Sequence, residues 1–291
     1  MSDSVPAAPG QFARVGITDN FYQTSAFIPM SFALVTTVHA SGETNIGPHA
    51  LVFPYSITAP HSMLLISRGN SGTAANLRRT GKCALNYIEF DRDRLQAIAS
   101  LGLPGQSMGA KADANPFSFV DSPTPAYSQD PAFPKLIGES VQVMECHWDE
   151  SAPVDSAAGA DDGTAASQFI LEIDSIYMRP PFDAGLDGEQ GFPNLPVFMG
   201  FRSNGSFWFA EHDTPFAIAP PQVEGLEWQA VKYLGDRLEE NMRFSDAACS
   251  RLTGVPKPFL KTVLLGIISV AKQRGMTEID TQLVDELNKQ R

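Results

Sequence analysis

Short runs of branched and aromatic residues recur along the first 180 residues of the chain, separated by segments rich in Gly, Pro, Ser and Asp. Runs of this length and composition are typical of β-strands, and the segments between them are typical of turns and loops. The pattern predicts strands over residues 31–39, 47–57, 62–67, 82–88, 139–148 and 167–178. Because strands dominate and helical stretches are few, it favours a closed or split β-barrel over a Rossmann sheet.

Helical spacing is confined to a few segments of this first part. Residues 73–79 and 91–101 are each predicted to form a short helix, and Ser71 stands where the cap of the first helix is expected. Residues 102–134 contain many Pro, Ser, Gly and Asp residues and are predicted to form a long loop.

The pattern changes beyond residue 182. Residues 183–225 are rich in Gly and Pro and are predicted to be irregular, whereas residues 259–275 show the helical spacing of apolar positions. We therefore expect a mainly β domain, a split barrel, over residues 1–182, followed by an irregular linker and a small C-terminal α-helical module over residues 183–291.

Composition and charge narrow the classes of function. Of the 291 residues, 43% are hydrophobic, enough for a sizeable core, and the net charge is −12. An acidic chain without a basic stripe is a poor candidate for binding nucleic acid or an anionic membrane. No stretch has the pattern of a signal peptide or the length of a membrane span, so we expect a cytoplasmic protein. The spacing of the Cys and His residues suggests neither a disulfide framework nor a metal site.

The stretch LLISRGNSGTAANLRRTGKCALNY, residues 64–87, joins two predicted strands through the first predicted helix. A strand end followed by a helix start offers unpaired backbone N–H groups to an anion. Ser67, Ser71 and Thr73 add hydroxyl donors, and Arg68 adds a cation that can pair with phosphate oxygens. Two interpretations stay open for this segment taken alone: a phosphate cradle, or an ordinary Ser-capped helix after a tight turn.

Several short motifs around this stretch occur in a specific order and spacing. They are LVTT at 34–37, Gly42, NIGPHA at 45–50, Pro60, ISR at 66–68, Ser71, Thr73, AN at 75–76, TG at 80–81 and Asn86, followed by PKLIGESVQVMEC at 134–146 and SQFILEIDSIYM at 167–178. Together they resemble the flavin reductase-like family, whose domain is an FMN-binding split barrel, over about residues 25–182.

The resemblance implies where a cofactor binds. The family's N-x-x-P turn and the strand around it line the isoalloxazine ring of FMN, largely through backbone groups, and here these residues are Asn45, Ile46, Gly47, Pro48, His49 and Ala50. The strand-to-helix segment holds the phosphate, here through Ser67, Arg68, Ser71 and Thr73. His49 is either a hydrogen-bond partner of the flavin ring or an ordinary turn histidine. The resemblance further implies a homodimer with the flavin near the subunit interface.

The activity that the resemblance implies is that of an FMN-binding flavoprotein oxidoreductase, a flavin reductase that takes electrons from NAD(P)H. No catalytic residue is identified. Gln168 stands where many flavin reductases have a histidine near the flavin, and a neutral side chain there implies weak use of NADH. The alternative is a non-catalytic protein that binds FMN or haem for storage or sensing.

The last part of the chain, residues 244–291, resembles the small helical module at the C-terminus of the catalytic subunit of dark-operative protochlorophyllide reductase. The matching positions are Ala247, Leu252, Val255, Pro256, Gly275, Ile279 and Asp280. A packing module without chemistry is the favoured interpretation, and a role toward a tetrapyrrole or a redox partner is the alternative.

Overall fold

The structure is a computed structural model that describes residues 10, 12–102, 106–152, 166–180, 182–186, 191–201, 205–218 and 227–289. The chain forms two compact units, residues 1–216 and residues 217–291. Each unit is described by itself.

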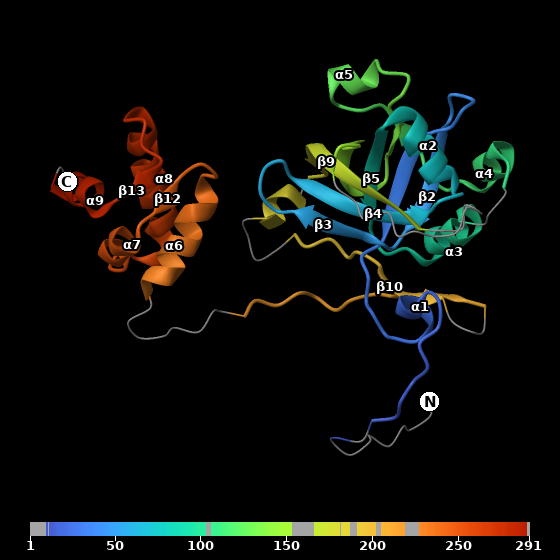
Figure 1. Ribbon diagram of the computed structural model, residues 1–291, viewed down its shortest axis with the longest axis horizontal. Helices are drawn as coiled ribbons and strands as arrows, with labels where there is room; N and C mark the ends of the chain where they lie inside the picture. The colour runs from blue at the N-terminus through green and yellow to red at the C-terminus, as the bar shows by residue number, and fades with distance from the viewer. Residues whose placement is uncertain are drawn as a thin grey trace. The chain divides into compact units, whose positions relative to one another are not determined.

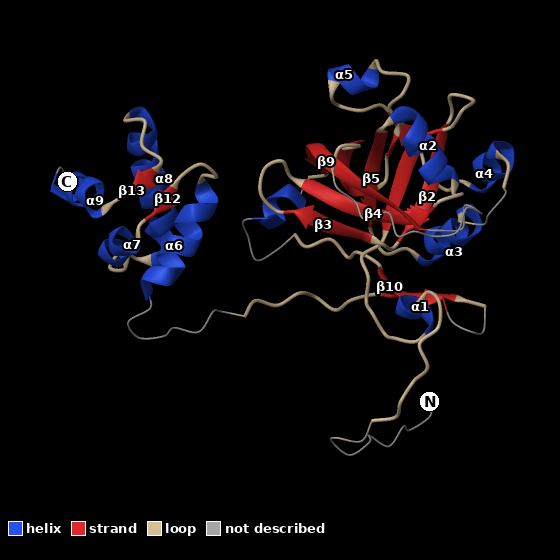
Figure 2. Cartoon of the chain, in the orientation of Figure 1, coloured by secondary structure: helices blue, strands red, loops and turns tan. Residues whose placement is uncertain are grey.

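A single antiparallel sheet forms the centre of the first unit (Figures 1 and 2). Its seven strands have the order β2-β1-β5-β8-β9-β4-β3. Their bounds are β1 Ala33–Val38, β2 Thr44–His49, β3 Val52–Ser56, β4 Ser62–Arg68, β5 Lys82–Ile88, β8 Ser140–Trp148 and β9 Ala166–Met178. The sheet curls into a half-barrel, which confirms the mainly β split barrel with C-terminal helices expected from the sequence.

The segment between residues 47 and 57 differs from the sequence prediction. A single strand, interrupted by proline, is predicted there, and this is wrong, because the chain leaves the sheet at Ala50 and Leu51 and forms two strands. β2 pairs with β1 and β3 pairs with β4, so these consecutive strands form the two opposite edges of the sheet. The N–H of Ile66 donates to the carbonyl oxygen of Leu51 at 2.9 Å, which holds the crossing segment against β4. Apolar residues continue through the crossing, so the sequence pattern does not show the change of partner strand.

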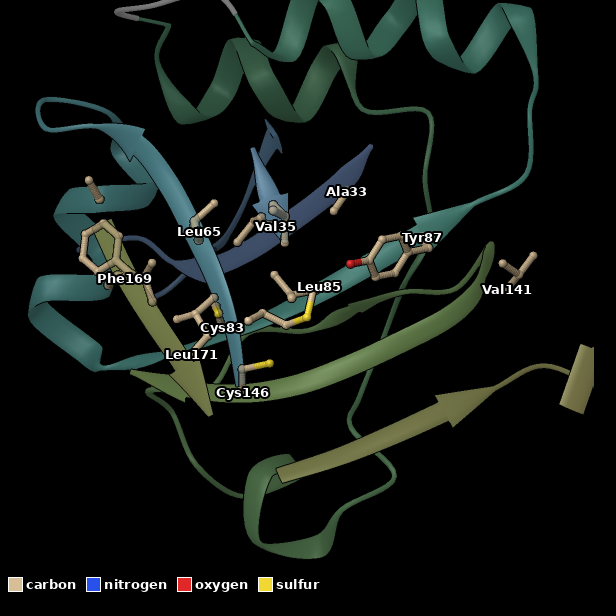
Figure 3. Packing of buried hydrophobic residues seen from close by; sticks show 14 residues of the cluster. Ala33, Val35, Leu65, Cys83, Leu85, Tyr87, Val141, Cys146, Phe169 and Leu171 are labelled. Carbon is tan, nitrogen blue, oxygen red and sulfur yellow. The ribbon is translucent and has the colours of Figure 1, made fainter. Parts of the chain in front are cut away.

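β1 is covered on both of its faces, which explains why each of its residues is buried. Ala33 and Val35 pack into the cluster inside the half-barrel, while Leu34 packs into a second cluster on the opposite face. Figure 3 shows the inner cluster, to which Phe169 and Leu171 of β9 contribute. Burying one such large apolar side chain contributes roughly 1.5–3 kcal/mol, so this core fixes the strands on which the site is built.

Helices and short strands surround the sheet. α2 (Gly72–Thr80) begins at the cap Ser71, as predicted, and ends at Gly81, whose φ of 66° is a left-handed conformation that glycine adopts without strain. α3 (Arg92–Leu101) begins at the cap Asp91. The remaining elements up to residue 186 are α1 Phe21–Thr24, α4 Met108–Ala114, β6 Phe119–Val120, α5 Pro125–Ser128, β7 Leu136–Ile137 and a 3₁₀ turn at Phe182–Leu186. Residues 102–134, predicted to be a loop, thus contain α4, β6 and α5.

A hairpin of β10 (Val197–Phe201) and β11 (Phe207–Ala210) belongs to the first unit. Phe198 exchanges two backbone hydrogen bonds with Met30, each 3.0 Å long. The sequence pattern predicts an irregular segment here, since Gly and Pro surround the two short strands. The described part of the predicted linker is therefore not entirely irregular, while the domain boundary near residue 182 stays a prediction.

The second unit is helical and has a core of its own. Its elements are α6 Glu227–Leu238, β12 Arg243–Phe244, α7 Asp246–Leu252, α8 Lys257–Gln273, β13 Glu278–Ile279 and α9 Thr281–Lys289. Gly235 lets α6 approach the ring of Phe244, because a Cβ at this glycine would lie 2.7 Å from that ring. Among the described residues, no helix combines the length and the apolar character that crossing a membrane requires.

Candidate functional site

The end of β4 and the start of α2 form a polar junction. The hydroxyls of Ser67 and Ser71 share a hydrogen bond of 2.7 Å, and Ser71 Oγ also accepts the N–H of Ala74 at 3.0 Å. Within the described residues, no group accepts a hydrogen bond from the backbone N–H of Gly72 or Thr73. Unpaired N–H groups in the first turn of a helix attract an anion, because they carry the positive end of the helix dipole.

β2 packs against this junction through one of its faces. His49 Nε2 and Thr73 Oγ1 lie 3.1 Å apart and share a hydrogen bond. The contact depends on Gly47, since a Cβ at residue 47 would lie 2.2 Å from Thr73 Oγ1 and 3.0 Å from His49 Nε2. The absence of a side chain at residue 47 therefore lets the helix start approach the strand.

The imidazole of His49 is held in its neutral form at pH 7. Burial is the larger cause that lowers the pKa of His49 to about 4, and the positive charge of Lys111 adds to it. A neutral imidazole offers one donor and one acceptor. The sequence leaves open whether His49 serves the flavin ring or the turn, and the structure adds that it contacts Thr73 at the helix start.

A buried network of amides and hydroxyls continues this face of β2. Lys111 of α4 donates to Asn45 Oδ1 at 2.7 Å, and Asn45 donates to Thr37 Oγ1 at 3.5 Å. Asn76 of α2 donates to the same hydroxyl at 3.0 Å. The network joins β1, β2, α2 and α4. Sequence reasoning missed Lys111, because it lies in a segment without apolar periodicity.

Arg68 points away from the two serines. Successive side chains of a strand alternate between its faces, and Ser67 is buried while Arg68 is exposed. Arg68 stands opposite Ala166 of β9 and Ile66 stands opposite Gln168, so Arg68 and Gln168 lie on one face of the sheet. In the described part of the chain, the Arg68 guanidinium makes no hydrogen bond or ion pair, so it is available to a ligand at the end of the strand.

A second arginine, Arg78 of α2, supports the turn between β4 and α2. It donates to the carbonyl oxygen of Gly69 at 2.7 Å and to Ser167 Oγ. Its guanidinium also lies 5.8 Å from the centre of the Phe169 ring. Sequence reasoning missed this residue too, because two of its partners, Ser167 and Phe169, are far away in the chain.

The alternate residues of β2 face the other way. Ile46 is buried in the cluster on the far face of the sheet, and Ala50 packs against that cluster. Pro48 faces α3, since a Cβ at Gly102 would lie 3.0 Å from Pro48 Cγ. Of the residues 45–50, the structure thus brings Gly47 and His49 to the helix start, and it places Asn45 on the same face of β2, in the network with Lys111. The other three residues can offer only backbone groups there.

Comparison with known proteins identifies the family of the chain. A family model described as the flavin reductase like domain matches residues 25–195, more than half of the chain. The chain belongs to this family. It is therefore a flavin reductase-like protein, and the members of this family are flavin-related oxidoreductases. No curated protein matches it significantly by sequence.

Two solved structures illustrate the flavin reductase-like fold. Nitrilotriacetate monooxygenase component B from Bacillus cereus is 15% identical, with a TM-score of 0.52 over 72% of this chain and 100% of the other. The 2-nitrobenzoate 2-nitroreductase from Pseudomonas fluorescens is 16% identical, also with a TM-score of 0.52, over 77% of this chain and 98% of the other. At such identities, the likeness supports the fold.

Proposed function

We propose that the chain binds FMN, with its phosphate at the junction of β4 and α2 and its ring along residues 45–50. The observation that carries the proposal is the pair of unpaired N–H groups at Gly72 and Thr73, beside the hydroxyls of Ser67 and Ser71. Arg68 ends the same strand on its opposite, exposed face, and its long side chain must turn around the strand end to bring its charge to the phosphate.

We also propose that the bound flavin takes electrons from NAD(P)H, as in a flavin reductase. The flavin supplies the redox chemistry when bound, and the chain supplies binding and orientation. His49 takes part as a neutral group that holds Thr73, and the network of Asn45 and Lys111 fixes the strand beside the ring. The cytoplasmic location stays a prediction.

Titration of the purified protein with FMN, FAD and riboflavin tests the cofactor. Tighter binding of FMN than of riboflavin supports the phosphate site, and equal affinities contradict it. Anaerobic mixing with NADH and with NADPH, followed by the loss of flavin absorbance near ~450 nm, tests the electron donor. A flavin that neither donor reduces contradicts the reductase proposal.

A second candidate is a non-catalytic FMN- or haem-binding protein for storage or sensing. Gln168 favours it, because this neutral side chain lies on the same face as Arg68, two strand positions from the end of β4. A cation at that position would form charge-assisted hydrogen bonds, roughly twice as strong as neutral ones, with the phosphates of a nicotinamide nucleotide. The absorption spectrum of the purified protein distinguishes flavin from haem, whose main band lies near ~400 nm.

We further propose that the protein is a homodimer. β3 is an edge strand, and Phe53 and Tyr55 are exposed on one of its faces, with Ile57 next along the chain. Exposed apolar groups on an unpaired strand are a common docking surface for a second chain.

A further inference from the structure

A cavity of about 790 Å³ lies in the first unit, lined by the β1–β2 hairpin, α4 and the segment around α5. Its volume is within the range of small-molecule sites. Much of its wall is apolar and aromatic, with Met108, Phe119, Tyr127 and Phe133 among the lining residues. Tyr127 and Phe133 are stacked, with ring centres 4.1 Å apart and planes at 4°. Such a wall suits a flat apolar ligand.

Lys111 brings a positive charge into this cavity. It is half-buried, and burial lowers its pKa. Its ammonium group donates to Asn45 Oδ1 and forms no ion pair with any described carboxylate. A lysine ammonium has three donors, so two remain for a ligand. A partly buried charge without a counter-charge is costly, and an anionic ligand removes that cost.

The other charged groups of the wall already have partners. Lys135 and Asp121 form an ion pair at 3.2 Å, Asp130 pairs with Lys82, and Glu43 accepts the hydroxyl of Ser41 at 2.8 Å. Lys111 is therefore the one lining cation, among the described residues, whose charge is uncompensated. A single free ammonium matches a monoanion such as a carboxylate better than a phosphate, which usually gathers several donors.

We propose that this cavity binds a small aromatic carboxylate, whose carboxylate pairs with Lys111 while its ring packs against the wall formed by Phe119, Tyr127 and Phe133. The binding site follows from the cavity and its charges and does not depend on a bound flavin. Because Asn45 belongs both to the cavity wall and to the segment proposed to line the flavin ring, a ligand held here is placed beside that segment.

The test is calorimetric titration of the full-length protein, as purified, with 2-naphthoate and with its neutral analogue 2-naphthalenemethanol. We expect Lys111→Met to weaken 2-naphthoate binding at least tenfold, because a charge-assisted bond is lost, and to change 2-naphthalenemethanol binding less than twofold. Lys111→Arg keeps the charge and should retain most of the affinity. Lys272→Met is the charge-matched control, since it removes a lysine of the second unit that does not line this cavity, and less than a twofold change is expected.

Three results would overturn the proposal. The first is a native protein that binds neither compound. The second is a Lys111→Met variant that loses affinity for both compounds by the same factor while its melting temperature is unchanged. The third is a Lys111→Met variant that no longer binds FMN but still binds 2-naphthoate. That result would assign Lys111 to the flavin phosphate instead. FMN binding is followed by absorbance in the same samples, so failure of the carboxylate site is separate from failure of the flavin site.

Discussion

Arg68 is an exposed cation at the end of β4, without a partner in the described chain. If it pairs with the FMN phosphate, the bond contributes about 1.5–3 kcal/mol. We expect Arg68→Ala to weaken FMN binding roughly 10- to 150-fold, as measured by fluorescence titration. Riboflavin, which has no phosphate, should bind the native protein and the variant equally well.

The control for this variant is Arg92→Ala, which removes an exposed arginine from the first turn of α3. We expect it to leave the affinity for both flavins unchanged. If Arg68→Ala weakens the binding of FMN and of riboflavin by the same factor, Arg68 acts through the fold and not through the phosphate.

His49 gives the fold a dependence on pH. Its pKa is about 4 in the folded chain, mainly because of burial and also because of Lys111, against 6.5 for an exposed histidine. Between these values the unfolded chain binds a proton that the folded chain does not, so the free energy of unfolding falls as the pH falls from 6.5 to 4. The loss from this group is about 3–4 kcal/mol at most.

Urea unfolding at pH 7, 5.5 and 4.5 measures this effect. We expect His49→Gln to remove much of the fall in the free energy of unfolding over this range, because glutamine does not titrate. His39→Gln, at the end of β1, is the matched histidine control. An unchanged pH profile in His49→Gln would show that other groups cause the acid sensitivity.

At the scale of elements, the contact between β2 and α2 depends on Gly47. A Cβ at this position would overlap Thr73 Oγ1, at 2.2 Å, so the helix start or the strand must move. We expect Gly47→Ala to lower the free energy of unfolding by about 1–3 kcal/mol, as overpacking of a close contact does. Gly72→Ala is the control, since nothing lies within 4 Å of a Cβ there, and its stability should stay near that of the native chain. Equal stabilities of the two variants would contradict a tight contact at Gly47.

The elements next to the site also show which parts of the structure can be predicted from the sequence. β4, α2 and β5 are predicted well, because Ser71, Gly81 and the apolar runs are local signals. α4 is not, since its sequence MGAKADA has no apolar periodicity and none of its residues is buried. The bond from Lys111 to Asn45 joins residues 66 positions apart, and tertiary packing alone creates it. The break between β2 and β3 is missed for the same reason, because the partner strands decide it.

On the scale of the whole molecule, the sequence predicts the two-part plan through its change of pattern. The C-terminal helices of that plan are confirmed, and the resemblance of residues 244–291 to a protochlorophyllide reductase module stays a prediction. The hairpin of β10 and β11 is the exception, since its pairing with Met30 rests on a contact between distant parts of the chain. Whether two chains associate depends on which apolar side chains stay exposed to solvent in the single chain.

β3 carries such groups at an edge of the sheet. Phe53, Tyr55 and Ile57 are 36%, 52% and 84% exposed. A second copy that covers this surface removes apolar area from water and pairs the open edge. We therefore expect sedimentation of the native protein at micromolar concentration to give about twice the chain mass of 31.5 kDa.

A charge placed within this surface tests whether β3 forms the dimer interface. Tyr55→Glu would bury an unpaired carboxylate between the subunits, at a cost of about 3 kcal/mol, which raises the dissociation constant roughly 100-fold or more. We expect this variant to sediment as a monomer with an unchanged circular dichroism spectrum. Tyr233→Glu is the matched control, since it changes another exposed tyrosine, 67% exposed and on α6, and should leave the dimer intact. A Tyr55→Glu protein that remains dimeric would place the interface elsewhere, and a monomeric native protein would exclude the homodimer.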